Sequence, residues 1–128
     1  MIKNYQIILG TFVSNMDSAG YTPVAKAAIK SCCNVPFCYS VLIVDGQSID
    51  NTQEIICNLD EKKINIHTSR HQWLPNSWTW EDIKLIETEC IVAVNNIECE
   101  HKIYMWLPVD TIIGVNSHRL FNQRYGIP

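Results

Sequence analysis

The sequence has few positive charges and no cluster of them. Its 128 residues carry 10 Lys and Arg against 13 Asp and Glu, a formal net charge of −3 with a pI near 5.7. Such a chain lacks the basic field that holds a phosphate backbone, so nucleic acid is not expected as a partner. No apolar run approaches the roughly 20 residues that cross a bilayer, and the N-terminus has no signal-peptide pattern. These absences predict a cytoplasmic protein without a transmembrane segment.

Paired C-x-x-C motifs are also missing. Six cysteines in a chain with no secretion signal predict reduced thiols rather than a disulfide scaffold. Cys57, Cys90 and Cys99 fall in apolar segments, where Cys is expected to act as a small hydrophobic side chain. His67 and His71 have no third ligand nearby, so ordinary loop histidines are expected there rather than a metal site.

What the chain does contain suits one ordinary globular domain. At 47% hydrophobic and 18% charged residues, the composition is that of a folded protein. The length allows a single core and is too short for two. We therefore expect residues 1–128 to form one domain.

Strand-like and helix-like segments alternate along the chain. Apolar runs predict strands at residues 5–13, 39–44, 64–67 and 103–107. Helices are predicted at residues 23–33, at residues 52–59, and after a cap at Ser77 or Thr79, where Ile83, Ile86, Cys90, Val94 and Ile97 form an apolar face. Right-handed crossovers make such strands parallel. The expected fold is α/β, an open, mostly parallel, doubly wound sheet of Rossmann-like type flanked by three helices.

The most informative stretch is residues 39–56, YSVLIVDGQSIDNTQEII, in which a buried strand ends at a carboxylate and a polar turn leads into a helix. Ligands of open α/β sheets collect where the carboxyl ends of strands meet helix N-termini. Asp45 and Asp50 lie at such a place. An ordinary turn with capping carboxylates is the alternative.

Residues 44–52, VDGQSIDNT, resemble the signature of the family-2 glycosyltransferases, in which a strand ends in D-(D/N/G)-x-S-x-D-x-T and the first Asp contacts the nucleotide base. The resemblance implies a GT-A fold that binds a nucleotide-diphosphate sugar, with a UDP-sugar favoured. It implies that Asp45, Ser48 and Asp50 help to bind the nucleotide.

Two further residues extend this nucleotide-binding set. In the resembled family the loop after the first strand touches the nucleotide, and residues 10–15, GTFVSN, keep Thr11 while Asn15 is displaced from the family pattern. A plain polar loop is the alternative there. Arg70 follows the third predicted strand, where a guanidinium can meet a diphosphate. The tryptophans of residues 73–80, WLPNSWTW, either stack on a sugar or base or cover the edge of the sheet.

Asp110 follows the fourth predicted strand within the sequence Pro108-Val109-Asp110. Its position resembles the D-x-D element of the same family, where the final Asp ligates Mg²⁺ or Mn²⁺ between itself and the diphosphate. Pro108 replaces the first Asp, and one carboxylate holds a divalent ion less tightly than two. A single capping Asp is the alternative. We expect Asp45 and Asp110 to converge at the carboxyl ends of neighbouring strands.

The resemblance covers residues 5–115, the N-terminal nucleotide-binding half of the family. The chain has no room for the acceptor-binding half. No general base is assigned, because His118, the sole titratable candidate downstream, has no motif around it. Three functions follow: an inverting glycosyltransferase, alone or with a companion chain; a truncated, non-catalytic nucleotide-binding or interaction module; or a doubly wound domain without a nucleotide. Apolar surface left by the missing half predicts a homo-oligomer or a companion chain.

Overall fold

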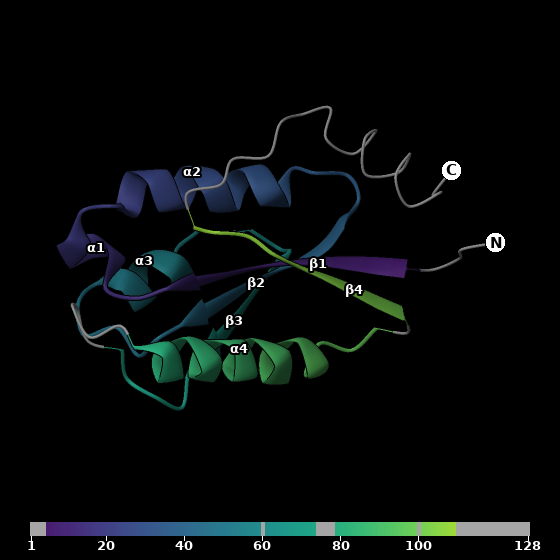
Figure 1. Cartoon of the computed structure of the whole chain (residues 1–128). Helices are drawn as coiled ribbons and strands as arrows, with labels where there is room; N and C mark the ends of the chain where they lie inside the picture. Colours follow the sequence, from purple (N-terminus) through teal and green to yellow (C-terminus); the bar gives the residue numbers. More distant parts are fainter. Residues whose placement is uncertain (1–4, 60, 74–78, 100, 110–128) are drawn as a thin grey trace.

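The computed structural model describes residues 5–59, 61–73, 79–99 and 101–109. Four strands and four helices are found there (Figure 1). In chain order they are β1 (Tyr5–Val13), α1 (Met16–Ala19), α2 (Thr22–Cys33), β2 (Cys38–Asp45), α3 (Thr52–Cys57), β3 (Ile64–Thr68), α4 (Trp80–Asn95) and β4 (His101–Trp106).

The four strands form one parallel sheet in the order β3-β2-β1-β4. The chain steps outward from β1 through β2 to β3 and then returns to the other side of β1, so the order reverses between β1 and β4. In the view of Figure 1, α2 and α3 lie above the sheet and α4 lies below it. The predicted doubly wound α/β fold is confirmed, and the described sheet is parallel throughout.

The core has two layers because the strand side chains alternate between the two faces of the sheet. Ile7, Leu9, Val41 and Ile43 pack with the buried side of α2, and Ile56 of α3 joins them. On the other face, Ile8, Phe12, Leu42 and Val44 pack with Ile86, Cys90, Ala93 and Val94 of α4. The continuous apolar run of β2 is thus needed because both faces of this strand are covered.

One predicted relationship between strands is wrong. Asp45 ends β2, whereas Asp110 comes after β4, and β1 lies between these two strands. The carboxyl ends of β2 and β4 are therefore not neighbours. An apolar run shows that a strand is buried, but it does not show on which side of β1 the strand is added.

The helices differ from the expectation in three places. The short helix α1 was not predicted, since its four residues are too few to show a helical period. Ile83 is partly exposed rather than on the buried face of α4, and Ile97 lies beyond the end of that helix. Glu89 is buried in their place.

The cysteines are free thiols, as predicted. Burial raises the pKa of Cys32, Cys33, Cys38 and Cys90 to about 11 in each case, so these thiols stay protonated at neutral pH. Cys57 corrects the prediction, because it lies on the exposed side of α3.

No helix in the described part of the chain combines the length and the apolar character that a membrane span needs.

The N-terminus of α4 is fixed by a capping box. Thr79 accepts a hydrogen bond from the backbone N–H of Asp82, and the Asp82 carboxylate accepts one from the backbone N–H of Thr79. Of the two predicted caps, Thr79 is thus the one the structure shows, and Ser77 lies outside the described residues.

Thr79→Ala should lower the free energy of unfolding by about 1 kcal/mol, because a backbone donor at the helix start loses its acceptor. Urea denaturation followed by circular dichroism measures this. Thr88→Ala is the matched control, since the Thr88 hydroxyl only bonds the Lys84 carbonyl on the same helix. Equal losses in the two variants would contradict the assigned cap.

Candidate functional site

The candidate site lies at the carboxyl edge of the sheet, where three connections are tied together by backbone hydrogen bonds. Gly46 N–H donates to the Val13 carbonyl (2.9 Å), and Ser69 N–H donates to the Asp45 carbonyl (2.7 Å). Trp73 N–H donates to the Gly46 carbonyl (2.8 Å). The connections after β1, β2 and β3 therefore form one continuous surface.

Asp45 is the buried anchor of this surface. It has no exposed area, and its carboxylate accepts hydrogen bonds from the Ser48 hydroxyl (2.5 Å) and from Gln53 Nε2 (2.7 Å). The Ser48 backbone N–H adds a longer contact of 3.3 Å. Asp45 and Ser48, two of the predicted nucleotide-binding residues, are thus brought together. In this conformation they hold the loop after β2 against the start of α3.

Asp50 links this loop to the one after β1. Its carboxylate accepts hydrogen bonds from the Ser18 backbone N–H (2.8 Å), the Ser18 hydroxyl (2.9 Å) and the Thr52 backbone N–H (2.9 Å). Burial acts to raise the pKa of Asp50, but the hydrogen bonds from Thr52 and Ser18 outweigh it and lower the pKa to about 2. Asp50 is therefore a charged link between two loops.

Asn15 joins all three connections. Its backbone N–H donates to the Ser48 hydroxyl (2.8 Å), its side-chain oxygen accepts from Ile49 N–H (2.8 Å), and its amide donates to the Trp73 carbonyl (3.2 Å). Asn15 is buried and has a φ of 50°, a left-handed conformation that Asn tolerates better than most residues. The sequence left its role open because Asn15 is displaced from the family pattern, and its partners come from distant loops.

Thr11 lies apart from these hydrogen-bonded groups. It stands within β1 opposite Ile43 and lines a small cavity of about 10 Å³ with Ala28 and Cys32 of α2. Its buried hydroxyl has no hydrogen-bond partner among the described residues. The structure therefore places Thr11 under α2, and it has no contact of this kind with Asp45, Ser48 or Asp50.

Arg70 is held by a carboxylate that the sequence analysis did not select. Glu89 of α4 is only 1% exposed, and its Oε1 accepts a hydrogen bond from Arg70 Nε (2.7 Å). Its Oε2 accepts one from the Arg70 backbone N–H (3.3 Å) and lies 2.9 Å from His67 Nε2. Burial acts to raise the pKa of Glu89, but the hydrogen bonds from His67 and Arg70 lower it below its usual value.

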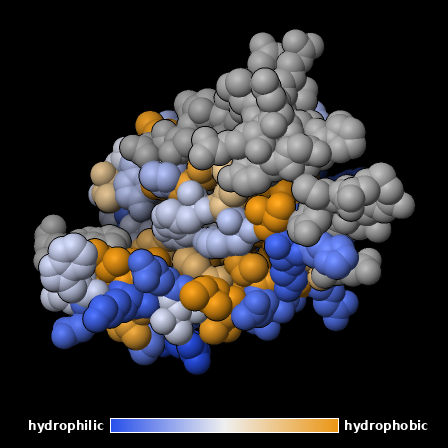
Figure 2. Space-filling view, turned by 45° about the vertical axis from the view of Figure 1, so that its right-hand side comes forward, coloured by the Kyte–Doolittle hydropathy of each residue, from blue (hydrophilic) through white to orange (hydrophobic). Residues whose placement is uncertain are grey.

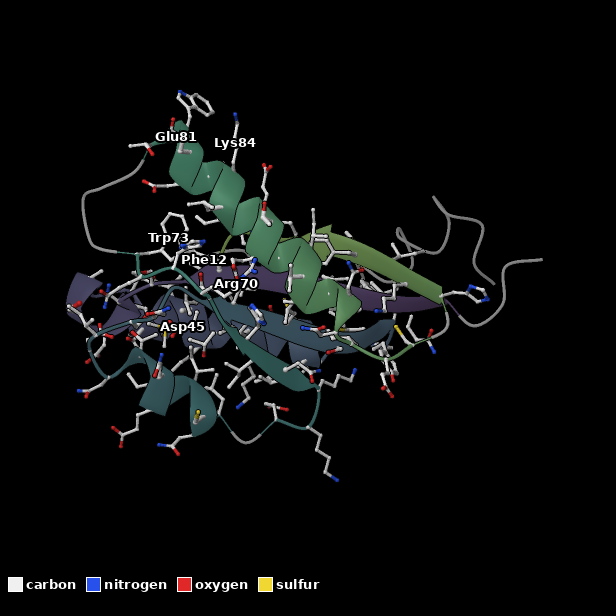
Figure 3. All side chains as sticks on the ribbon, turned by 90° about the horizontal axis from the view of Figure 1, so that it is seen from below. Phe12, Asp45, Arg70, Trp73, Glu81 and Lys84 are labelled. Atoms are coloured by element: carbon white, nitrogen blue, oxygen red, sulfur yellow. The ribbon has the colours of Figure 1, made fainter. Side chains whose placement is uncertain are left out.

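The Arg70 side chain is nevertheless 65% exposed. Glu89 holds its Nε, while most of the side chain faces solvent. The bond to Glu89 places Arg70 on the α4 side of the sheet, and in Figure 3 the Asp45 label lies farther from that helix. The signal for Glu89 was available in the sequence: it is three residues after Ile86, on the face of α4 that packs against the sheet.

Trp73 covers the edge of the sheet, one of its two predicted roles. It is buried, and its ring meets Phe12 edge to face with centroids 5.8 Å apart (Figure 3). Gly46 is required beneath it, because a Cβ at that position would overlap the Trp73 ring. Trp80 is instead strongly exposed, and Trp78 lies outside the described residues.

Asp110, the predicted metal ligand, lies outside the described residues. Within the described ranges, no three His, Cys, Asp or Glu side chains are grouped so that they would hold a metal ion.

An apolar groove runs beside the site between α4 and β4. Its volume is about 620 Å³. The groove is lined by the carboxyl end of β1, by α4, by β4, and by Pro108 and Val109 after β4. The lining side chains include Phe12, Ile83, Glu87, Ile91, Tyr104 and Trp106. This lining suits an apolar group better than a diphosphate.

No protein-family model matches the sequence, and no curated protein matches it either. Solved structures of S. aureus TarS do match in three dimensions. The TarS 1-349 structure has a TM-score of 0.62 at 14% identity, over 94% of this chain and 33% of that one. The same fragment in complex with UDP has a TM-score of 0.61 over the same shares of the two chains. In complex with UDP-GlcNAc it has a TM-score of 0.58, over 96% of this chain and 32% of the TarS fragment.

This similarity confirms the GT-A fold implied by the sequence resemblance. The chain spans about a third of the TarS fragments that it matches. At 14% identity the likeness establishes the fold alone.

The depressed pKa of Asp50 predicts how the loops respond to acid. Because the folded pKa of about 2 lies below the ordinary aspartate pKa of 3.8, the Asp50 carboxylate stabilises the fold above about pH 4, and this stabilisation is lost as the pH falls toward 2. NMR titration of the Asp50 carboxyl carbon should give a midpoint well below 3.8.

Asp50→Asn should lose less stability between about pH 4 and 2 than the wild type. Glu54→Gln removes an exposed carboxylate of α3 and leaves Asp50 with its donors. The stability of this variant should therefore fall over the same pH range by as much as that of the wild type. An Asp50 midpoint at the ordinary value would refute this role.

Proposed function

We propose that this chain binds a nucleotide-diphosphate sugar, with UDP as the favoured nucleotide, at the carboxyl edge of its sheet. The observation that carries the proposal is the match of 94% of the chain to a TarS structure in complex with UDP. The motif that predicted such a ligand lies at the same edge, where Asp45, Ser48 and Asp50 share one hydrogen-bonded loop. Ligands of open α/β sheets bind at this edge.

Arg70 supplies the positive charge that such a ligand needs. A diphosphate prefers a guanidinium, which can donate two parallel hydrogen bonds. Glu89 holds Arg70 through Nε and the backbone, and most of the side chain still faces solvent. An arginine fixed in this way loses less conformational freedom on binding than a freely moving one.

Asp45 and Ser48 act on the ligand through the loop that they shape. Their hydrogen bonds fix the backbone of residues 46–49, and Asn15 holds the same loop through Ile49 N–H. A direct contact of Asp45 with the base, as the resemblance implies, requires the carboxylate to exchange its bond to Ser48 or Gln53. The loop is then the element that adjusts when the base binds.

Mg²⁺ or Mn²⁺ belongs to the proposal through Asp110. A divalent ion at that carboxylate would neutralise charge on the diphosphate. One carboxylate is a weak site by itself, so the ion is expected to bind together with the nucleotide and not before it.

Sugar transfer by inversion is the further activity that the resemblance implies. The second candidate is a module that binds the nucleotide without turnover or does so for a partner. The apolar groove between α4 and β4 supports the second candidate, because it offers a surface for another protein.

Isothermal calorimetry with UDP tests the binding. Arg70→Ala should weaken the affinity by about tenfold or more, because a charged hydrogen bond to the diphosphate is lost. Lys26→Ala, which removes an exposed cation on α2, should leave the affinity unchanged. Circular dichroism of each variant shows whether it is folded, since Arg70→Ala also removes a partner of Glu89.

Absence of binding by wild-type protein to UDP and to the other nucleoside diphosphates, at about millimolar concentration, would refute the proposal. Equal binding by Arg70→Ala and wild type would refute the role of Arg70.

The role of Asp110 has its own test. UDP affinity should rise when Mn²⁺ is added to the wild type, and Asp110→Asn should lose most of this rise, because the substitution removes an anionic ligand while keeping the shape. The affinity measured in EDTA should be the same for both proteins. A metal effect that survives in Asp110→Asn would show that the ion is held elsewhere.

A further inference from the structure

Helix α4 presents a stripe of exposed side chains along the flank that borders the groove. Trp80 is 81% exposed and Ile91 is 60% exposed, and Lys84 and Glu87 between them are exposed as well. Figure 3 shows Lys84 pointing away from the sheet, and Figure 2 shows apolar side chains among charged ones in the lower half of that view. Trp80 and Ile91 thus leave a large apolar side chain in water at each end of the stripe.

The spacing of these residues is that of a helix–helix contact. They follow one another at intervals of four, three and four residues, so they lie along one line of the helix as in a heptad pattern. From Trp80 to Ile91 this line is about 16 Å long at 1.5 Å per residue. The order along it is apolar, basic, acidic, apolar.

That order is complementary to itself in one orientation. When two such helices run antiparallel, Trp80 meets Ile91 of the other copy, and Lys84 meets Glu87 of the other copy. Each of these pairs occurs twice around the two-fold axis. A parallel pair would instead bring Lys84 against Lys84 and Glu87 against Glu87, which is repulsive.

The charges of the stripe are available for such a contact. Both ion pairs found among the described residues involve Glu89, on the buried side of the helix. Lys84 and Glu87 therefore have no ion-pair partner within that part of the chain.

The groove beside the stripe can receive the tryptophan. Ile83, Glu87 and Ile91 form its α4 side, and Trp106 forms part of its β4 side. In the antiparallel arrangement Trp80 of one copy lies over Ile91 of the other, next to this groove. Insertion there would remove the indole and the exposed Trp106 from water.

We infer that the α4 face binds a second copy of this chain, with the two α4 helices antiparallel and Trp80 of each copy in the groove of the other. The contact is short, so the dimer forms and dissociates with protein concentration. The inference does not rest on the proposed function, and it is tested without nucleotide.

Sedimentation equilibrium from about 10 µM to about 500 µM, the range suited to a small transient interface, measures the dimer. Trp80→Ala should weaken dimerisation by about tenfold or more, because the aromatic side chain that fills the groove of the other copy is lost. The exposed position of Trp80 makes this variant safe for folding. Val24→Ala removes an exposed apolar side chain on α2 and should dimerise like the wild type.

Charge reversal tests the antiparallel pairing. Lys84→Glu and Glu87→Lys should each weaken the dimer, because every copy then places like charges opposite each other. The double variant restores opposite charges at both pairs and should dimerise within about threefold of the wild type, as expected for coupled sites.

Three results would overturn the inference. A wild type that is monomeric throughout the range leaves the face without a second copy and points to a different partner chain. A dimer unchanged by Trp80→Ala lies on another surface. A double charge variant no better than the single ones excludes the antiparallel register.

Discussion

The loops at the carboxyl edge of the sheet depend on Asp45, whose carboxylate is buried at the end of β2. An anion in that position needs donors, and it obtains them from Ser48 and Gln53. The same hydroxyl of Ser48 accepts from Asn15, and Asn15 reaches the connections after β2 and β3. The loops at this edge are therefore shaped by the need to pair one buried charge.

Glu89 repeats this arrangement on the other face of the sheet. Glu89 is buried among apolar residues of α4. Its partners are His67 of β3 and Arg70, which follows the end of β3 by two residues. A buried charge without partners is far more costly than a surface one, so each carboxylate fixes the side chains around it. One consequence is that Arg70 is presented to solvent from a rigid base, while Asp45 is withdrawn into the structure.

The sequence predicted most of the fold because its strands are buried apolar runs and its long helix has a clear cap. The bounds of β1 were correct at both ends, and Thr79 was one of two named caps for α4. The side on which β4 is added was not predictable, since a parallel strand carries no mark of its neighbour. For the site, the motif located Asp45, Ser48 and Asp50 in one loop. The role of Asn15 stayed open, and Glu89 was missed although its spacing after Ile86 places it on the buried face of α4. The partners of both residues are distant in sequence, and only the folded chain brings them within hydrogen-bonding distance.

The order of the strands also governs how the chain is assembled. β1 pairs with β2 after one helical crossover, whereas its pairing with β4 joins Tyr5 to His101, at nearly opposite ends of the described chain. During synthesis, β1, β2 and β3 can associate while β4 has not yet left the ribosome. Until it arrives, one side of β1 is an unpaired strand edge with apolar residues on both faces, the kind of surface that aggregates. We expect the slow, long-range pairing of β4 with β1 to be the folding step at which the chain is most prone to aggregate. Faster pairing of these two strands would raise the yield of native protein.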